Sequence, residues 1–351
     1  MRAVWLPDSQ HLLAQSFEKV RSHLLRIDTK TEEVTRLTDF FASYPHYSAS
    51  ADGETVAYLG QARDAPANVW IYEEGTKDRR ITTLSPQVEE WALGEVREVR
   101  WENERDGTTL YGVLVTPPGD TLERPYPTIV HVHGGPHFHW GLGWLGWRGW
   151  AQWLAPRGYA VFLPNPRGST GRSWDFARSI HHQLGGPDGR DVLAGVDALV
   201  ERGIADSSRL YVGGWSYGGF LTAWLITKTD RFRAAVVGAG ISNYYSLAGG
   251  SGLGAYWSDH YFPAFPHRRP DAYWDSSPVT HLRRVTTPTL ILHGQDDPKI
   301  SSNQGRQLYN GLQRVGVESE LVIYPREGHG IGERAHQVDL LQRVRDWYDE
   351  H

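Results

Sequence analysis

The chain has 351 residues, enough for one large domain and a smaller one, and its 40% hydrophobic and 22% charged residues are typical of a folded globular protein rather than a disordered one. A net charge of −5 without a basic run argues against binding to nucleic acid or to an acidic membrane surface. The absence of cysteine excludes disulfides, thiolate metal ligands and a cysteine nucleophile.

The N-terminal sequence MRAVWLPDSQHLLAQSF has no uninterrupted apolar run of signal-peptide length, so we expect a cytoplasmic protein. Up to residue 92, short alternating runs separated by turn signals are typical of antiparallel strands. Two similar units occur there, WLPDSQHLLAQSF…HLLRIDTKTEEVTRLTDF and YSASADGETVAYLG…NVWIYEEGTKDRRITTLS. A repeat of about 45 residues with several strands per unit predicts a partial β-propeller of about two blades for residues 1–92. A small β-sandwich is the alternative.

Residues 93–351 alternate between apolar strands and helical stretches. EVRWENERDGTTLYGVLVTPPG predicts a hairpin around Asp106 and Gly107. Apolar runs bounded by Gly or Pro follow, and they are typical of strands buried on both faces of a mostly parallel sheet: TIVHVHGG, YAVFLPNP, RLYVGGW, RAAVVGAG, PTLILHG and ELVIYP. Helices are expected in GRDVLAGVDALVERG, GFLTAWLITKTD, NQGRQLYNGLQRVG and HQVDLLQRVRDWYDEH. The pattern predicts an α/β domain with helices on both faces of the sheet.

The stretch GGWSYGGF places Ser216 between a predicted strand and a predicted helix. A nucleophile at such a sharp turn needs small neighbours, which Gly214 and Gly218 supply. The Tyr217 N–H, at the start of the helix, can point toward an oxyanion. The G-x-S-x-G pattern alone is weak, because a glycine-rich turn with a capping serine has the same sequence.

A serine hydroxyl needs a base and the base needs an orienting acid, so both are expected at later strand ends. LILHGQDDPKI ends a strand with Asp296 and Asp297, and VIYPREGHGIG ends the next with a loop that carries His329. The order Ser, Asp, His is that of α/β-hydrolases. Either aspartate can instead cap the following helix, so the residues alone leave the choice between them open.

Several motifs together resemble the prolyl oligopeptidase family of serine peptidases, in particular its acylaminoacyl-peptidase and dipeptidyl-aminopeptidase-like branch. The resemblance covers nearly the whole chain and is carried by HVHGGPH, LPNPRGSTGRSWDF, GGPDGRDVLAGVDALVERGIAD, RLYVGGWSYGGF, GISNYYSL, PTLILHGQDDPKIS and YPREGHG. It implies an α/β-hydrolase fold preceded by a partial β-propeller.

The resemblance also implies roles for individual residues. It makes Ser216 the nucleophile, His329 the base and Asp297, rather than Asp296, the acid. It implies that the Gly135 N–H joins the Tyr217 N–H in an oxyanion hole, which a loop leaving the strand TIVHV can reach. No cofactor or metal is implied.

The chain departs from the family pattern in two ways. Members normally carry a complete propeller, whereas we expect only two blades here, and open blade edges suggest a homo-oligomer formed through residues 1–92. Many members also have an arginine two residues after the acid, where it can hold a carbonyl of the substrate. Here that position is Lys299, which lacks the planar fork of arginine. A solvated loop lysine is the alternative for this residue.

Other signals are weaker. The stretch GLGWLG, residues 141–146, matches a dinucleotide-binding pattern but no strand immediately precedes it. Four histidines in HVHGGPHFH could bind a metal, but no carboxylates at suitable spacing accompany them: His131, His133, His137 and His139. Five tryptophans recur at helical spacing and are expected to pack, or else to form an apolar wall near the site or a surface for further blades: Trp140, Trp144, Trp147, Trp150 and Trp153.

Three classes of function follow from these observations. The first is a serine peptidase that acts on peptides or acyl-peptides through an acyl-enzyme, with a carboxylesterase for small esters as the rival within the same chemistry. The second is an inactive fragment whose blades form a binding surface. The third is a metallohydrolase, which chelators would inhibit.

Overall fold

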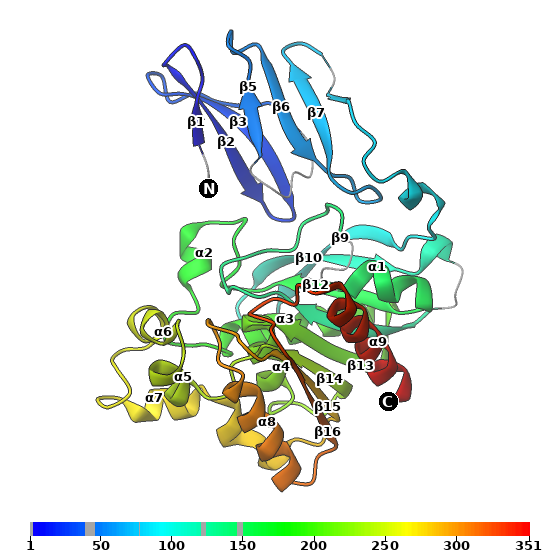
Figure 1. Ribbon diagram of the computed structural model, residues 1–351, viewed down its shortest axis with the longest axis vertical. Helices are drawn as coiled ribbons and strands as arrows, with labels where there is room; N and C mark the ends of the chain where they lie inside the picture. The colour runs from blue at the N-terminus through cyan, green and yellow to red at the C-terminus, as the bar shows by residue number, and fades with distance from the viewer. Residues whose placement is uncertain (1–2, 39–45, 77, 121–123, 146–149) are drawn as a thin grey trace.

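Two small antiparallel sheets form the N-terminal part of the chain (Figure 1). The structure, a computed structural model, describes residues 3–38, 46–76, 78–120, 124–145 and 150–351. The first sheet has four strands in the order β1(Ala3–Trp5), β2(His11–Glu18), β3(Arg21–Asp28) and β4(Val34–Arg36). The second repeats this arrangement with β5(Tyr47–Ala49), β6(Thr55–Gly60), β7(Asn68–Glu73) and β8(Arg79–Arg80).

Alternating side chains build the core between these two sheets. In β6, Val56 and Tyr58 are buried while their neighbours in the strand are partly exposed, as a strand with one buried face requires. They pack in one apolar cluster with Leu13 and Leu24 from the first sheet. Two meanders of four strands agree with the predicted partial propeller of two blades.

The larger sheet begins after the predicted boundary between residues 92 and 93. It has eight strands in the order β16-β15-β14-β13-β11-β12-β10-β9. The hairpin of β9(Glu95–Asn103) and β10(Thr108–Thr116) pairs antiparallel with the rest. The remaining strands pair parallel with one another: β11(Tyr126–Val132), β12(Ala160–Asn165), β13(Ala205–Trp215), β14(Phe232–Gly238), β15(Thr289–Gly294) and β16(Ser319–Tyr324).

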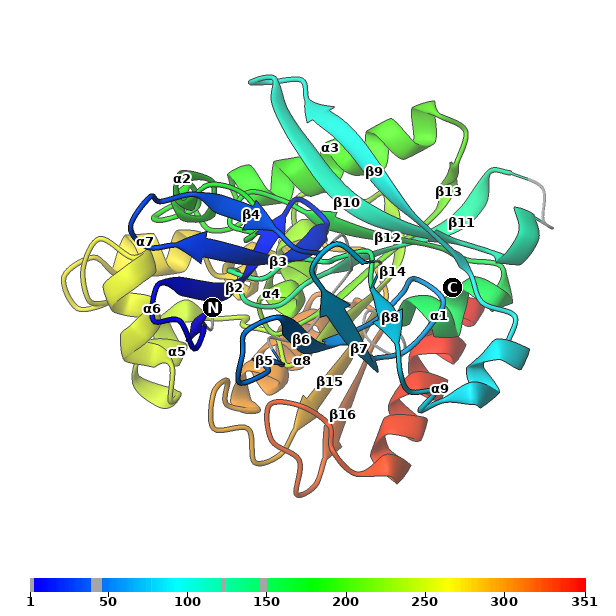
Figure 2. The ribbon, with the colours of Figure 1, turned by 90° about the horizontal axis from the view of Figure 1, so that it is seen from above.

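Helices cover both faces of this sheet, as predicted (Figures 1 and 2). One apolar cluster joins the sheet to α3(Pro187–Glu201), α4(Tyr217–Leu225) and α8(Asn303–Arg314). A second cluster joins the opposite face to α1(Ala151–Leu154) and α9(Arg334–Glu350). This is the architecture of an α/β-hydrolase. In the part of the chain that the structure describes, no helix is long and apolar enough to cross a membrane.

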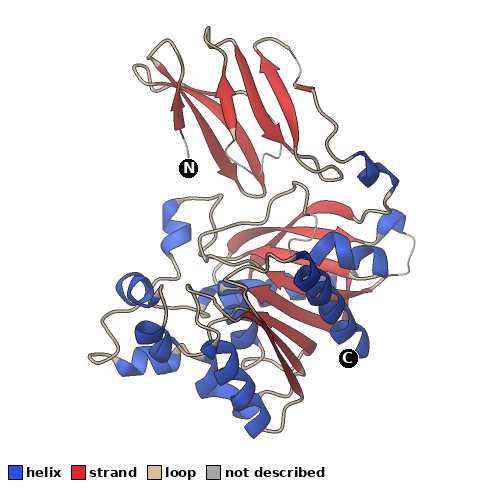
Figure 3. Cartoon of the chain, viewed as in Figure 1, coloured by secondary structure: helices blue, strands red, loops and turns tan. Residues whose placement is uncertain are grey.

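Short helices fill the connections between the strands (Figure 3). One follows β12, α2(Trp174–Arg178), and three lie between β14 and β15: α5(Tyr244–Gly250), α6(Gly254–Tyr261) and α7(Pro270–Asp275). Short 3₁₀ helices span Pro86–Glu90, Pro118–Asp120, Ala155–Arg157 and Pro278–Arg284. Helices α2, α5, α6 and α7 were not predicted, because their sequences are too short to show helical periodicity.

The turn between β2 and β3 inserts into the α/β domain. Val20, at this turn, is fully buried and belongs to the same apolar cluster as Trp140 and Leu142. Its carbonyl oxygen accepts the Leu142 N–H at 2.8 Å, and the Lys19 N–H donates to the Gly171 carbonyl at 2.6 Å. The segments that it contacts follow β11 and β12, so the first blade lies against the carboxyl edge of the large sheet.

The tryptophan-rich segment packs as predicted but is not helical at its start. Trp140 and Trp150 are buried, whereas Trp147 and Gly146 lie outside the described residues. Of the four tryptophans that the structure describes in this segment, only Trp153 lies in an α-helix, α1, so the helical spacing was misleading.

Residues 141–145 are not helical, and two of them are glycines, Gly141 and Gly143. A Cβ on Gly143 would come within 2.6 Å of the Gln61 side-chain amide nitrogen, so glycine allows the second blade to pack closely there. Glycine in turn disfavours a helix. The Trp140 N–H and carbonyl are instead bound by the Asn165 amide, at 2.7 and 2.9 Å.

Candidate active site

Ser216 lies at the sharp turn between β13 and α4, as the sequence predicted. Its φ of 62° and ψ of −119° are a strained conformation for a residue with a side chain. A Cβ on Gly214 would lie 2.6 Å from Gly218, and a Cβ on Gly218 would lie 2.1 Å from the Val132 carbonyl oxygen. Both glycines are therefore needed to bring the strand, the helix and β11 together.

A chain of hydrogen bonds joins three side chains from separate loops. The Ser216 hydroxyl lies 2.9 Å from His329 Nε2, and His329 Nδ1 lies 2.7 Å from Asp297 Oδ2. All three loops leave the carboxyl ends of parallel strands, which meet at the same edge of the sheet. This is the geometry in which an imidazole can take a proton from a serine while a carboxylate orients the ring.

Asp297, not Asp296, contacts the histidine. Asp296 is exposed, and its backbone N–H donates to the Glu327 carbonyl at 2.8 Å. Asp297 is buried, and its Oδ1 accepts the N–H groups of Lys299 and Ile300 at 2.8 and 3.0 Å.

The surroundings of Asp297 favour its charged form. Burial alone would raise the pKa of this carboxyl, but hydrogen bonds from His293, His329 and the Ile300 N–H outweigh burial. They hold the pKa of Asp297 well below its usual range. A carboxylate in this position can stabilise an imidazolium on His329.

The loops that carry Asp297 and His329 pack directly against each other. A Cβ on Gly294 would lie 2.1 Å from the Gly328 carbonyl oxygen, so the two loops cross at a distance that only glycine permits. The Trp215 indole N–H donates to the His329 carbonyl at 2.7 Å and ties the histidine loop to the serine turn. The side chains of Ser216, Asp297 and His329 are therefore held in place by backbone contacts as well as by their own hydrogen bonds.

The two predicted oxyanion donors belong to two separate segments near the serine. Tyr217 is the first residue of α4, where backbone N–H groups have no acceptor within the helix. Gly134 and Gly135 follow β11, and a Cβ on Gly134 would lie 3.3 Å from Ser216 Cβ. Gly135 has a φ of 125°, which side-chain-bearing residues rarely adopt. Both positions are compatible with the predicted role.

The side chain of Tyr217 is buried behind the serine. Its ring stacks on Trp257, with centroids 5.9 Å apart, and its hydroxyl donates to Asp188 Oδ2 at 2.5 Å. Burial raises the pKa of Tyr217 well above its ordinary value, so the phenol keeps its proton. Burial also raises the pKa of Asp188 to about 7. The Asp188 carboxyl thus supports the residue that supplies one predicted oxyanion donor.

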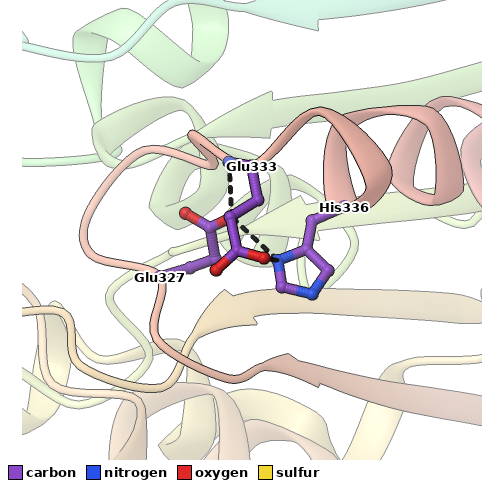
Figure 4. A group of neighbouring side chains, drawn as sticks. All are labelled: Glu327, Glu333 and His336. Atoms are coloured by element: carbon purple, nitrogen blue, oxygen red, sulfur yellow. Dashed lines mark hydrogen bonds and ion pairs between the residues drawn. The ribbon is translucent and has the colours of Figure 1, made fainter.

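A second carboxylate cluster holds the loop that carries His329 (Figure 4). Buried Glu327 accepts the N–H groups of Gly332 and Glu333 at 2.7 and 2.8 Å and the His336 Nδ1–H at 2.8 Å. Within the described residues, Glu327, Glu333 and His336 are the one group whose ligand atoms are close enough to share a metal ion. Backbone N–H groups and an imidazole already bind the Glu327 oxygens, so the cluster links the loop that carries His329 to α9 by hydrogen bonds.

The four histidines of HVHGGPHFH do not converge on a common point. His133 lies 2.7 Å from the Gly134 carbonyl and 2.9 Å from the Ser169 hydroxyl. The ring nitrogens of the other three face separate surroundings: His131 between Trp140 and Trp150, His137 beside Gly168 and Tyr261, and His139 beside Thr170. The arrangement does not resemble a metal site built from these residues.

Lys299 lies in the loop of the acid. The residue is exposed, and its backbone N–H donates to Asp297 at 2.8 Å. The side chain therefore leaves the loop next to Asp297, at the same edge of the sheet as Ser216.

The same fold and motifs occur in known proteins. Residues 147–351 match the model of the prolyl oligopeptidase family. The chain belongs to the prolyl oligopeptidase family. The resemblance seen in the sequence motifs is thereby confirmed.

Individual relatives place the chain near the acylaminoacyl peptidases of this family. An uncharacterized peptidase of Bacillus subtilis, YuxL, is 30% identical over 100% of this chain and 53% of its own length. The human acylamino-acid-releasing enzyme is 26% identical over 99% of this chain and 49% of its own. The structure of an acylaminoacyl peptidase in complex with Z-Gly-Gly-Phe-chloromethyl ketone superposes with a TM-score of 0.89 at 25% identity, over 99% of this chain and 55% of that one. The chain thus spans about half the length of the prolyl oligopeptidase family members that it matches.

Sequence reasoning missed the residues that support these family motifs. Asp188, Glu327 and Ser169 are buried polar residues whose partners lie on other segments of the chain. Each lies inside a stretch that carried the family resemblance, GGPDGRD, YPREGHG or LPNPRGSTG, but nothing in those stretches names the partner. His293 had one local signal, since it precedes Gly294 at the end of the strand that leads to Asp297.

Proposed function

We propose that the protein hydrolyses peptide or acyl-peptide bonds with Ser216 as nucleophile, His329 as general base and Asp297 as the orienting acid. The observation that carries the proposal is the hydrogen-bonded chain from Asp297 through His329 to a serine in a strained strand-to-helix turn. Such a chain gives a serine hydroxyl the base that it otherwise lacks.

The reaction runs in two halves. Ser216 Oγ attacks the carbonyl carbon of the scissile bond while His329 Nε2 takes the hydroxyl proton. The negative charge that develops on the carbonyl oxygen is met by the N–H groups of Gly135 and Tyr217. His329 then gives its proton to the leaving nitrogen, the C–N bond breaks, and an ester on Ser216 remains. Water, deprotonated by His329, hydrolyses this ester and restores the serine.

The acidity of Asp297 supports this division of roles. A carboxyl with a strongly lowered pKa stays ionised when the neighbouring imidazole gains a proton, so it stabilises the imidazolium without taking the proton itself. Removal of this charge leaves the ring without its Nδ1 acceptor and lets the wrong tautomer form.

The names of the relatives support the choice of substrate. Acylamino-acid-releasing enzyme and acylaminoacyl peptidase are names for enzymes that act on acylated peptides. A carboxylesterase would use the same three side chains, so the substrate is tested separately from the nucleophile. Turnover of an acylated amino-acid amide against the matched ester separates the two activities, and a peptidase turns over the amide.

A fluorophosphonate probe tests the nucleophile. The wild-type protein should be labelled at one site, and Ser216→Ala should abolish both labelling and turnover while its thermal midpoint stays close to that of the wild type. Ser301→Ala is a matched control, because Ser301 lies in a loop at the same edge of the sheet and contacts neither His329 nor Ser216 through any hydrogen bond found among the described residues. Labelling that persists in Ser216→Ala would refute the assignment.

A further inference from the structure

Two exposed aromatic side chains lie beside the loop that carries Gly135. Phe138 is 41% exposed and Trp174 is 63% exposed. Single exposed aromatic residues are common on protein surfaces and need no explanation. These two differ because both adjoin His137, which lies two residues after Gly135: Phe138 follows it in the chain, and the Trp174 ring lies 5.8 Å from its ring. Two separate loops therefore present aromatic rings at one place.

This place lies close to the nucleophile. A Cβ on Gly134 would lie 3.3 Å from Ser216 Cβ, and a Cβ on Gly135 would lie 3.1 Å from the Phe138 nitrogen. Gly135 is itself exposed, so the surface between Ser216 and Phe138 is open to a ligand. An extended peptide advances about 3.3 to 3.6 Å per residue, so a substrate held at Ser216 brings the side chains next to its scissile bond toward this surface.

The Phe138 ring is held in position from behind. Its backbone N–H donates to the Pro136 carbonyl at 2.8 Å, and its carbonyl accepts the Thr170 N–H at 2.9 Å. The ring meets buried Trp140 edge to face, with centroids 5.8 Å apart, and lies 5.8 Å from the ring of buried His133. Part of the Phe138 ring thus packs on buried aromatic groups, and the rest stays exposed.

The loop after β12 brings Trp174 to the same place. Its neighbour His137 is bound at both ring nitrogens, since Nδ1 lies 2.9 Å from the Gly168 carbonyl and Nε2 lies 2.9 Å from the Tyr261 hydroxyl. The Gly168 N–H donates to the Phe176 carbonyl at 3.1 Å, so α2 is tied to the same loop. In Figure 1, α2 lies between the first blade and α6. The backbone that carries Trp174 is therefore well supported although its side chain is exposed.

The chemistry of these two rings suits an apolar ligand. Aromatic side chains offer large contact areas and have only two rotatable bonds, so little conformational entropy is lost when a ligand packs on them. Clefts that bind substrate side chains are lined in the same way, by apolar and aromatic groups on a rigid framework. An aromatic ligand gains most, because ring pairs attract each other beyond the effect of the buried area.

We propose that Phe138 and Trp174 form a substrate subsite that binds an apolar side chain next to the scissile bond, and an aromatic one best. The side chain belongs to the residue that supplies the attacked carbonyl or to the residue that leaves; its chemistry is the same in both cases. This inference rests on the proposed function, because it names the substrates that Ser216 would cleave.

Two series of acetylated dipeptide amides test the subsite. Acetyl-Xaa-alanine amides vary the residue before the scissile bond, and acetyl-alanyl-Xaa amides vary the residue after it, with glycine, alanine, leucine or phenylalanine as Xaa. In one series we expect the wild-type kcat/KM to rise by at least about tenfold from glycine to phenylalanine. Trp174→Ala and Phe138→Ala should each lower the phenylalanine value about tenfold and leave the glycine value unchanged.

Two further variants separate specificity from folding. Trp174→Phe keeps a ring at this position, so its kcat/KM for the phenylalanine substrate should stay within about threefold of the wild type. Trp91→Ala is the matched control, because Trp91 is an exposed tryptophan in the linker between the second blade and β9. Its kcat/KM should match the wild type for every substrate. A fold defect would lower turnover of the glycine and phenylalanine substrates alike.

The outcomes distinguish this inference from the proposed function. Equal losses on the glycine and phenylalanine substrates, or no loss in either series, would overturn the subsite and leave the assignment of Ser216 intact. Labelling that persists in Ser216→Ala would instead overturn the proposed function.

Esters carry the same comparison if the amides are not turned over. Acetyl-phenylalanine ethyl ester against acetyl-alanine ethyl ester tests the acyl side, and acetyl-alanine benzyl ester against the ethyl ester tests the leaving side. A preference for the aromatic ester that Trp174→Ala removes supports the subsite. A preference that Trp174→Ala retains, or no preference in the wild type, contradicts it.

Discussion

Replacing Asp188 by asparagine should stabilise the protein, and should do so more at high pH than at low pH. The carboxyl is fully buried, its Oδ2 accepts the Tyr217 hydroxyl, and its Oδ1 has no hydrogen-bond partner in the described part of the chain. Burial raises the pKa of this carboxyl from 3.8 to about 7. The ionised form of Asp188 is therefore unfavourable in the folded protein, whereas water solvates it in the unfolded chain.

The sign and size of the effect follow from this difference in pKa. Below the unfolded-state pKa both states hold the proton, and the carboxyl does not affect the free energy of unfolding. As the pH rises toward about 7, the unfolded chain releases the proton while the folded protein keeps it, so stability falls. A difference of about three pKa units lowers the free energy of unfolding by about 4 kcal/mol in total, and about 2 to 3 kcal/mol of this loss occurs between about pH 5 and about pH 8.

Thermal midpoints of both proteins at these two pH values measure the effect. Asparagine keeps an oxygen that can accept the Tyr217 hydroxyl, and it cannot ionise. Asp188→Asn should therefore exceed the wild type by several degrees more at about pH 8 than at about pH 5. Asp197→Asn, an exposed position on the same helix, should stay within about 1 °C of the wild type at both. If Asp188→Asn raises the thermal midpoint equally at the two pH values, or more at the lower pH, the reasoning is refuted.

Four other predictions concern the site and its support. Asp297→Asn should lower kcat by about 10³ to 10⁴ in a steady-state assay, and Asp296→Asn by less than about tenfold; the reverse ranking would show that the wrong carboxylate is assigned. Lys299→Ala should raise KM for peptide amides but not for a small ester, and Lys299→Arg should restore it, whereas equal losses on both substrates would indicate a structural role. Glu327→Gln should destabilise the protein by about 1 to 3 kcal/mol in denaturant unfolding and lower kcat, because it removes an acceptor from the hydrogen bonds that hold the histidine loop; an unchanged stability and kcat would contradict this role of Glu327. Light scattering should find the chain associated through residues 1–92, whose two sheets end in edge strands, and a monomer would contradict this expectation.

Local signals were enough to predict the serine turn and the strand ends around it. At Gly214 and Gly218 two backbone segments approach so closely that only glycine fits, and this steric requirement is visible in the sequence as the two glycines. Each parallel strand of the large sheet contains an apolar run with a Gly or Pro boundary, so the loops that carry Ser216, Asp297 and His329 could be placed at strand ends. The choice of Asp297 over Asp296 needed the family resemblance, because both aspartates follow the same strand.

Long-range contacts between polar groups were not predictable. Asp188 meets Tyr217 across 29 positions, and His133 meets Ser169 across 36, and no spacing rule connects such pairs. Burial decides their chemistry, and burial depends on how the whole domain packs. The tryptophan spacing misled for a related reason: glycine at position 143 disfavours a helix and packs closely against Gln61 of the second blade, and this contact is not visible in the local pattern.

The buried turn at Val20 makes the catalytic domain depend on the strands that precede it. A chain cut at residue 92 would leave an apolar hole where Val20 packs, and would leave the Leu142 N–H and the Gly171 carbonyl without their acceptor and donor. The two parts should therefore unfold in one cooperative transition rather than in two. Exchange of the N-terminal strands between family members would succeed only when the incoming turn has the same length and a small apolar residue at its tip.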